Sequence, residues 1–236
     1  MTPDTVVELV DVIKEYPGSP PLRVLHGMSL AIESGELVAV VGASGSGKST
    51  MLSIMGTLDD PTSGTVLIDG TDAAVLAERD RAVLRARRIG FVFQQFFLLP
   101  ALSALDNVAL GLLYSGVPAT ERSVRAAAAL ERVGLGARMK HRPGQLSGGE
   151  QQRVAIARAI VGNPSVLFAD EPTGALDSTT GEHILELLTS IAGTGTAVVI
   201  ITHDPHIAER TQRQVSIHDG RIVSDTGSPE MEEVAA

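Results

Sequence analysis

The chain has 236 residues, and 44% of them are hydrophobic, which is enough to build the buried core of an α/β domain. Its 19 lysines and arginines against 28 aspartates and glutamates give a formal net charge of −9, which argues against a nucleic-acid-binding surface, so no nucleic acid partner is expected. The absence of cysteine excludes disulfides, cysteine-ligated zinc sites and iron–sulfur clusters.

The N-terminal stretch MTPDTVVELVDVIKEY has neither a basic start nor a long apolar segment, so no signal peptide is expected. Apolar runs such as LVAVVG and AVVIIT are much shorter than the roughly 18 residues that a membrane-spanning helix needs. The sequence therefore predicts no membrane-spanning segment.

Strand and helix patterns alternate along the chain. Residues 1–40 are rich in strand-forming residues, a strand is expected at 38–41, a helix at 46–58, a strand within 60–70, a helix at 74–88 and a strand at 89–94. Apolar residues then follow helical spacing from Phe96 to about Gly162. A strand is expected at 165–172, a helix at 178–193, a strand at 196–204, a hairpin at 214–227 and a frayed tail at 228–236.

This order predicts an α/β fold in which a helical block interrupts a parallel-sheet core. We expect one domain over residues 1–236, with the core at about 1–95 and 163–225 and a helical subdomain at about 96–162.

The stretch GASGSGKST lies between an expected strand and an expected helix and matches G-x-x-x-x-G-K-[ST], a phosphate-binding loop. Glycines allow several backbone amides to face one phosphate, the lysine adds positive charge, and the serine after it can ligate Mg²⁺. A flexible Gly/Ser turn is the simpler alternative, and the flanking strand and helix argue against it. The candidate nucleotide-binding residues are Gly42, Ala43, Ser44, Gly45, Ser46, Gly47, Lys48, Ser49 and Thr50.

Asp170 and Glu171 end the apolar strand SVLFA, where α/β sheets bind ligands. Asp170 is a candidate Mg²⁺ ligand, and Glu171 is a candidate for polarising an attacking water. The simpler alternative is an acidic turn before Pro172.

Three further polar residues are candidates for the nucleotide site, each supported by a weaker sequence pattern. His203 follows the strand TAVVIIT and is a candidate contact to the terminal phosphate, although a structural turn or a metal pair with His206 would also fit. Gln94 ends IGFVFQ and can offer an oxygen to a metal or water. Tyr16 is a candidate for stacking on adenine or an ordinary half-buried tyrosine.

Two other stretches have an open interpretation. FFLLP, directly after Gln94, is either core packing or a link to a partner. The cluster Arg85, Arg87 and Arg88 is most simply a solvated helix face, and contact with a membrane-side partner or lipid is the alternative.

The stretch QLSGGEQQRVAIARAI begins with a serine and two glycines at an expected helix start. The first amides of a helix form an anion site, but this one has no lysine. An ordinary helix start capped by Ser147 is the alternative.

Taken together, GASGSGKST, the Gln94 segment, LSGGEQQ, VLFADE, ALD and ITHD occur in the order that resembles ATP-binding cassette (ABC) ATPases. The resemblance covers about residues 5 to 225. It is closest to the subgroup for macrolide export, lipoprotein release and FtsE-type cell division, although Phe97 and Ala175 stand where members commonly carry asparagine.

The resemblance implies a RecA-like P-loop NTPase core with an N-terminal antiparallel β subdomain and an inserted helical subdomain. It implies ATP and Mg²⁺ as ligands, with Lys48, Glu171 and His203 as catalytic residues and Ser49, Gln94 and Asp170 around the metal. It also implies a head-to-tail homodimer, in which Ser147, Gly148 and Gly149 contact the partner copy's γ-phosphate and Asp177 lies near the interface.

The same resemblance implies membrane permease subunits as partners, a location on the cytoplasmic face of the membrane, and export or mechanical work driven by ATP hydrolysis. An energy module of a non-transporting membrane complex that regulates cell-wall enzymes, and a soluble ABC ATPase, are the alternatives.

Overall fold

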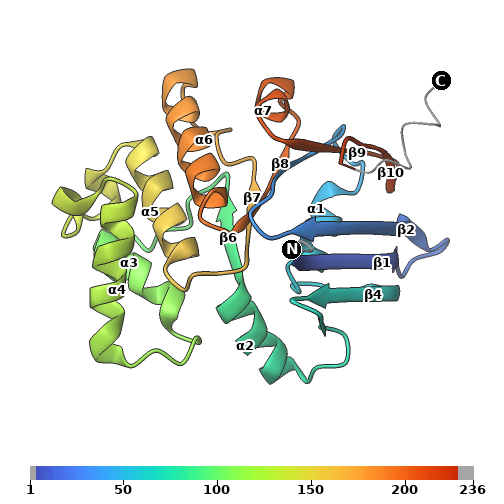
Figure 1. The fold of residues 1–236 in the computed structure, drawn as a ribbon, viewed down its shortest axis with the longest axis horizontal. Helices are drawn as coiled ribbons and strands as arrows, with labels where there is room; N and C mark the ends of the chain where they lie inside the picture. Colours follow the sequence, from blue (N-terminus) through green and yellow to red (C-terminus); the bar gives the residue numbers. More distant parts are fainter. Residues whose placement is uncertain (1–3, 228–236) are drawn as a thin grey trace.

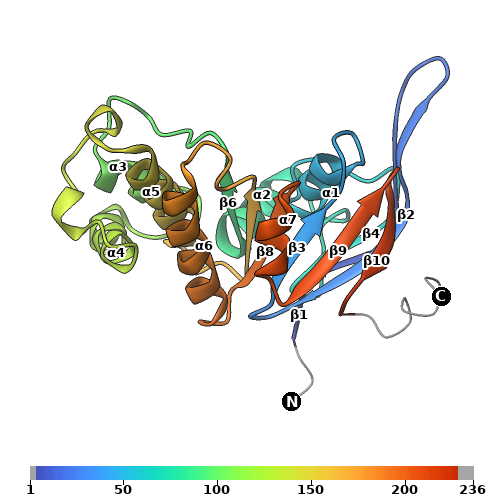
Figure 2. The same ribbon diagram turned by 90° about the horizontal axis from the view of Figure 1, so that it is seen from above.

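The computed structural model describes residues 4–227; residues 1–3 and 228–236, which include the tail expected to fray, lie outside the described residues. Two sheets and a group of helices are arranged in a row (Figures 1 and 2). The helices of residues 104–160 lie at one end and the antiparallel sheet lies at the other. The second, mainly parallel sheet begins beside those helices, and its far edge lies alongside the antiparallel sheet.

The antiparallel sheet has the strand order β2-β1-β4-β5. It is formed by β1 (Thr5–Tyr16), β2 (Leu22–Glu33), β4 (Ser63–Ile68) and the two-residue β5 (Thr71–Asp72). Its buried residues recur with short breaks along β1 and β2, as expected for strands with one face on the core.

The second sheet has the order β10-β9-β3-β8-β7-β6. Parallel pairing joins β3 (Leu37–Val41), β6 (Ile89–Phe93), β7 (Val166–Asp170), β8 (Ala197–Thr202) and β9 (Arg213–His218), and β10 (Arg221–Asp225) closes the edge as an antiparallel hairpin with β9. All six residues of β8 are buried, because helices or strands cover both faces of this sheet.

The two faces of the parallel sheet belong to two separate buried clusters. Along β7, Val166 and Phe168 pack with the antiparallel sheet and α1 (Lys48–Met55), while Leu167 and Ala169 pack with the helices on the other side. This alternation follows from the two-residue period of a strand.

Residues 94–162 contain helices and loops and no strand. The helices are α3 (Ala104–Ala109), η1 (Leu110–Leu112), α4 (Ala119–Arg132), η2 (Gly136–Arg138), η3 (Pro143–Gln145) and α5 (Gly148–Ile160). Their buried residues share one cluster with α6 (Ser178–Ala192) and with the facing side of the parallel sheet. The short α7 (Pro205–Glu209) follows β8.

One helix begins later than its sequence pattern predicts. The helix expected at 74–88 is α2 (Glu78–Arg88), because the Asp72 carboxylate accepts a hydrogen bond from the Ala74 amide at 2.9 Å and forms a turn there. No helix within residues 4–227 is long and apolar enough to cross a membrane.

Candidate functional site

The loop between β3 and α1 folds around an open space. Gly45 and Gly47 have φ angles of 81° and 102°, which only glycine adopts without strain, and Gly47 is the N-cap of α1. A Cβ on Gly42 would lie 2.3 Å from the Ile217 carbonyl oxygen, so the loop needs glycine there for close approach to β9. The loop therefore leaves the first turn of α1 open to a ligand.

Lys48 lies at the start of α1 and reaches back over this loop. Its Nζ donates to the carbonyl oxygens of Gly42 at 2.7 Å and Ala43 at 2.8 Å. The buried hydroxyl of Ser46 has no hydrogen-bond partner among the described residues. A bound phosphate would give Lys48 a charged partner.

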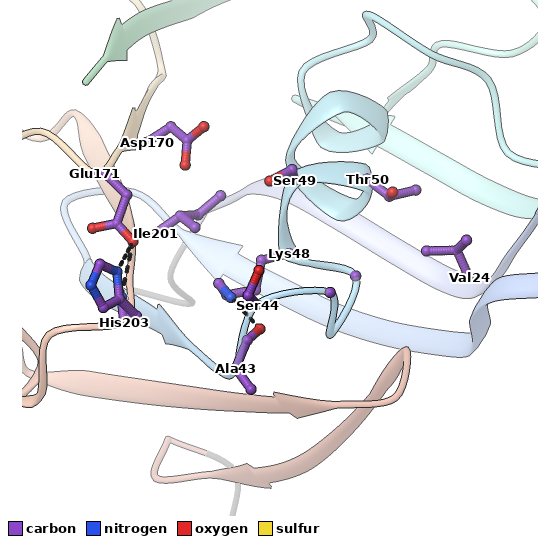
Figure 3. A pocket seen from close by; sticks show the side chains of 12 residues that line it. Val24, Ala43, Ser44, Lys48, Ser49, Thr50, Asp170, Glu171, Ile201 and His203 are labelled. Atoms are coloured by element: carbon purple, nitrogen blue, oxygen red, sulfur yellow. Dashed lines mark hydrogen bonds and ion pairs between the residues drawn. The ribbon is translucent and has the colours of Figure 1, made fainter. Parts of the chain in front are cut away.

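Asp170 and Glu171 stand where β7 ends, across the open space from α1 (Figure 3). Burial and the neighbouring Glu171 raise the pKa of the Asp170 carboxyl above its ordinary value, and Lys48 opposes that shift. A cation between these carboxylates and α1 would remove this repulsion.

Glu171 is held by the end of β8. Its Oε1 is 2.6 Å from Nδ1 of His203 and accepts from the His203 amide at 3.1 Å, while Oε2 accepts from the Thr202 hydroxyl at 3.2 Å. These contacts fix the carboxylate, and the hydrogen bond from Glu171 raises the pKa of the His203 imidazole. The backbone of Glu171 has a φ of 45°, a left-handed conformation that is costly for glutamate and that recurs at functional sites.

The phosphate loop and the two strand ends enclose a cavity of about 790 Å³. Figure 3 shows its walls: Lys48 and Ser49 on one side, and Asp170, Glu171 and His203 on the other. Of the expected loop residues, Ala43, Ser44, Gly45, Gly47, Lys48, Ser49 and Thr50 line it, whereas Gly42 and Ser46 support it from behind.

Gln94 lies in an adjoining cavity of about 500 Å³. Glu171 and His203 line both cavities, and Asp177 and His206 line the second one. Gln94 approaches Gly174 so closely that a Cβ there would lie 2.9 Å from Nε2. Gln94 therefore stands beside the loop that follows Glu171, and its metal contact remains a prediction.

The start of α5 is separate from the phosphate loop. Ser147 is the N-cap: its hydroxyl accepts from the Glu150 amide at 3.2 Å, and Glu150 accepts from the Ser147 amide at 2.8 Å. Ser147 and Gly148 are exposed, and Gly149 is buried against Thr180. These three residues are not among those that line the cavity at Lys48 within residues 4–227.

Tyr16 also lies outside that cavity. Its hydroxyl donates to Asp59 at 3.0 Å, and Nζ of Lys14 is 4.8 Å from the ring centroid. The structure therefore gives Tyr16 a local role in joining β1 to the loop after α1, and the adenine contact remains a prediction.

Several residues that sequence reasoning did not single out also belong to the site or support it. Val24 and Ile201 line the cavity from β2 and β8, and Thr202 orients Glu171. Gln152 is fully buried and donates to the carbonyl oxygens of Pro172 and Phe93, so it ties α5 to the ends of β7 and β6. The adjacent glutamines in LSGGEQQ were the available signal for Gln152, but their spacing did not reveal which one is buried.

The donors around the cavity fit a nucleotide with Mg²⁺. Ser49 and Asp170 supply oxygen atoms, which Mg²⁺ prefers, and Mg²⁺ usually takes only one or two protein ligands beside phosphate oxygens and water. Residues 4–227 contain no cluster of three or more His, Cys, Asp or Glu that would form an all-protein cage.

Comparisons with known proteins agree with this geometry. The family model described as "ABC transporter" matches residues 25–174. The macrolide export ATP-binding/permease protein MacB of Brucella melitensis biotype 1 is 50% identical over 222 residues, which cover 94% of this chain and 34% of that protein. The uncharacterized ABC transporter ATP-binding protein YknY of Bacillus subtilis (strain 168) is 51% identical over 219 residues, covering 92% and 95%.

The solved dimeric structure of a post-hydrolysis state of the ATP-binding cassette MJ0796, bound to ADP and Pi, matches with a TM-score of 0.83. It is 44% identical, and the match covers 93% of this chain and 97% of that one. This chain spans about a third of the length of the first export proteins that it matches. The chain belongs to the ABC transporter family as an ATPase cassette, which confirms the expected family, fold class and enzyme class.

Proposed function

We propose that two copies of this chain bind two Mg·ATP head to tail, hydrolyse them, and use the closing and opening of the dimer to drive membrane permease subunits in export or mechanical work. The observation that carries the proposal is the single cavity in which Lys48, Ser49, Asp170, Glu171 and His203 converge. That set supplies phosphate binding, metal ligation and a candidate base in one place.

Within one copy, each residue has a defined task. Lys48 and the loop amides hold the β- and γ-phosphates, and Lys48 exchanges its two carbonyl partners for phosphate oxygens. Glu171 orients and deprotonates the attacking water, while Thr202 and His203 hold its carboxylate. Ser49 and Asp170, with Gln94 nearby, would hold Mg²⁺, which would supply positive charge against the phosphates.

The second copy supplies the other side of the site. Ser147 and Gly148 are exposed at the start of α5, and Glu150 already occupies part of that helix end. Such a lysine-free helix start is a weak anion site alone but an effective second contact to a phosphate that is already bound. A dimer of this kind is two-fold and self-complementary, and the MJ0796 relative was solved as a dimer.

A groove of about 740 Å³ supports a permease partner. It lies between α2, the start of β6 and the helices η1 and α5, and exposes the apolar side chains Leu58, Phe97, Leu99 and Tyr114. Its charged lining residues are two arginines, Arg85 and Arg158, although the chain carries a net charge of −9. We assign it to an apolar permease helix with an acidic side chain.

Relatives such as MacB are named as export proteins with an ATP-binding and a permease part in one chain. We propose the same pairing here, with the cassette on the cytoplasmic face of the membrane. We also propose that residues 96–162 move as a helical subdomain against a core of about 1–95 and 163–225 when ATP binds.

The test is to tag the chain in its native cell, solubilise the membranes gently and identify what co-purifies in stoichiometric amount. A permease with a large extracytoplasmic domain is the expected result. If the chain co-purifies instead with a membrane complex bound to a cell-wall enzyme, the same ATPase activity serves a complex that does not transport a substrate. Soluble proteins alone would contradict the permease assignment.

A further inference from the structure

The loop after Gln94 contains a strained residue. Among the described residues, seven non-glycine residues have a positive φ, and four of them are aspartate or asparagine, which tolerate this region. The others are Thr57, Phe97 and Glu171. Phe97 has a φ of 46°, and its Cβ makes that conformation unfavourable.

Arg158 holds the strained loop in place. Its Nη1 donates to the Phe97 carbonyl oxygen at 2.7 Å, and its Nη2 donates to the Phe96 carbonyl oxygen at 2.9 Å. Arg158 lies on α5 and is buried deeply enough that desolvation lowers the pKa of its guanidinium. A half-buried charge thus holds an unfavourable backbone conformation.

The ring of Phe97 is directed into solvent rather than into the core. Its relative exposure is 61%, and it meets Phe93 edge-on with ring centroids 5.5 Å apart and an interplanar angle of 82°. The exposed part lines the groove between α2 and the helices η1 and α5. Packing within this chain therefore does not explain why most of the Phe97 ring is exposed.

Another part of the groove lining has a similar arrangement. Thr57, which also has a positive φ, precedes the exposed Leu58, and its carbonyl oxygen accepts from Nη1 of Arg85 at 2.7 Å. Leu58, Arg85, Phe97 and Arg158 all line the groove. Two strained residues, each held by a groove arginine, therefore fix the shape of the walls before any partner binds.

We propose that Phe97 is the residue by which this cassette recognises its permease: the strained loop, held by Arg158, presents the phenylalanine ring to an apolar side chain on a permease helix that also carries an acidic residue facing Arg85 and Arg158. Asparagine or glycine would fit the backbone of position 97 better, so the ring itself is what the strained position provides. The inference rests on the proposed permease partner and names the residue that selects it.

The first test needs only the isolated chain. Phe97→Asn removes an exposed ring and introduces a residue suited to a positive φ, so the midpoint of thermal unfolding should rise by roughly 2–4 °C. The matched control is Val223→Asn on β10, which removes a side chain of 56% exposure at a position without positive φ and should not raise the midpoint. A lower midpoint for Phe97→Asn would mean that the contact with Phe93 outweighs the strain, and would overturn the proposal.

The second test uses the permease identified by co-purification with the wild-type chain, reconstituted in nanodiscs. Phe97→Asn should weaken binding of the cassette to that permease by roughly 10-fold or more, as for an interface anchor. Phe97→Leu should retain more binding because it stays apolar, and Val223→Asn should bind as the wild type does. Equal binding of Phe97→Asn and wild type would overturn the role of Phe97 while leaving the proposed function intact. If no permease co-purifies with the wild-type chain, both proposals fail.

Discussion

The starts of α1 and α5 are both glycine-containing helix N-termini, but they are capped differently. α1 begins after Gly47, which offers no side chain to cap it, and Lys48 follows at once. α5 begins after Ser147, and Ser147 and Glu150 satisfy each other's backbone amides. The hydrogen bond from the Ser147 amide lowers the pKa of Glu150, so a negative charge stays at this helix end.

The difference indicates that the two helix starts have separate roles in binding phosphate. The α1 end is left open, has a cation, and faces carboxylates that need a counter-ion, so it can hold a nucleotide within one copy. The α5 end is stable without a ligand and is exposed, so it suits a phosphate that another copy already holds. Damage to the two helix starts should therefore have different consequences.

The largest effect should come from Glu171→Gln, which removes the base at the α1 side. ATP hydrolysis should fall by roughly 10²–10⁴-fold, because glutamine cannot accept the proton of the attacking water. The ATP-bound dimer should then persist, since the γ-phosphate that joins the copies is not lost. Phosphate release and light scattering measure the two effects. Glu186→Gln, at an exposed position of α6, is the control and should hydrolyse ATP normally. A monomeric Glu171→Gln variant in the presence of ATP would contradict the account.

The next effect addresses the α5 end. Ser147→Asp keeps a good N-cap but places a carboxylate where the partner's γ-phosphate would lie, so dimerisation should weaken by about 10²-fold. ATP binding to a single copy, measured by fluorescence of a nucleotide analogue, should be unchanged. Ser147→Asn caps the helix without the charge and should dimerise far better than Ser147→Asp. If the two variants dimerise equally, the charge at this helix end is not near a phosphate.

A smaller effect should follow from Thr202→Val, which changes only the support of Glu171. The substitution keeps the shape of the buried side chain but removes its hydrogen bonds to the Glu171 carboxylate and the Asp204 amide. We expect kcat to fall by about tenfold with little change in KM, because the base is less well oriented while nucleotide binding is intact. Thr202→Ser should restore most of the rate. A change confined to KM would show that Thr202 acts on binding instead.

The smallest effect on catalysis should come from Asp225, the last residue of β10, which does not line the cavity at Lys48. Burial alone would raise the pKa of the Asp225 carboxyl, but its hydrogen bonds with Arg213 lower it below the usual 3.8. A lowered folded-state pKa adds stability above the unfolded pKa and loses it as the pH falls through the folded value. Between pH 5 and about pH 2, the wild type should therefore lose stability more steeply than Asp225→Asn.

At neutral pH, Asp225→Asn should be less stable by about 1–3 kcal/mol, while its phosphate release per folded chain stays normal. Urea unfolding across the pH range measures this. The exposed Asp219→Asn serves as the matched control. Parallel pH curves for Asp225→Asn and wild type would contradict the assignment to the Arg213 pair.

Local patterns predicted most of this architecture. The buried strand before Gly42, the phosphate loop and the acidic end of β7 were predicted because each depends on neighbours in the sequence. Val24 and Thr202 were missed because Val24 reaches the cavity, and Thr202 reaches Glu171, through strand pairing and sheet packing, which link residues far apart in the chain.

Backbone conformation and contacts between distant segments account for other differences between the expected and the observed structure. A turn at Asp72 makes α2 begin later than expected. The sequence FFLLP did not reveal that Phe97 adopts a positive φ or that Arg158 donates a hydrogen bond to its carbonyl oxygen. Tyr16 is drawn toward Asp59 by contacts between β1 and the loop after α1, which no local pattern specifies.

The most direct test of a site shared between two copies is complementation. Lys48→Met removes the cation at the α1 end, Ser147→Asp damages the α5 end, and each variant alone should be inactive. In a head-to-tail dimer of one copy of each, one site contains both damaged ends and the other contains both intact ends. An equal mixture should therefore recover up to about a quarter of the wild-type ATPase rate, since half of the dimers are mixed and each has one intact site. A mixture no more active than its separate components would contradict the account.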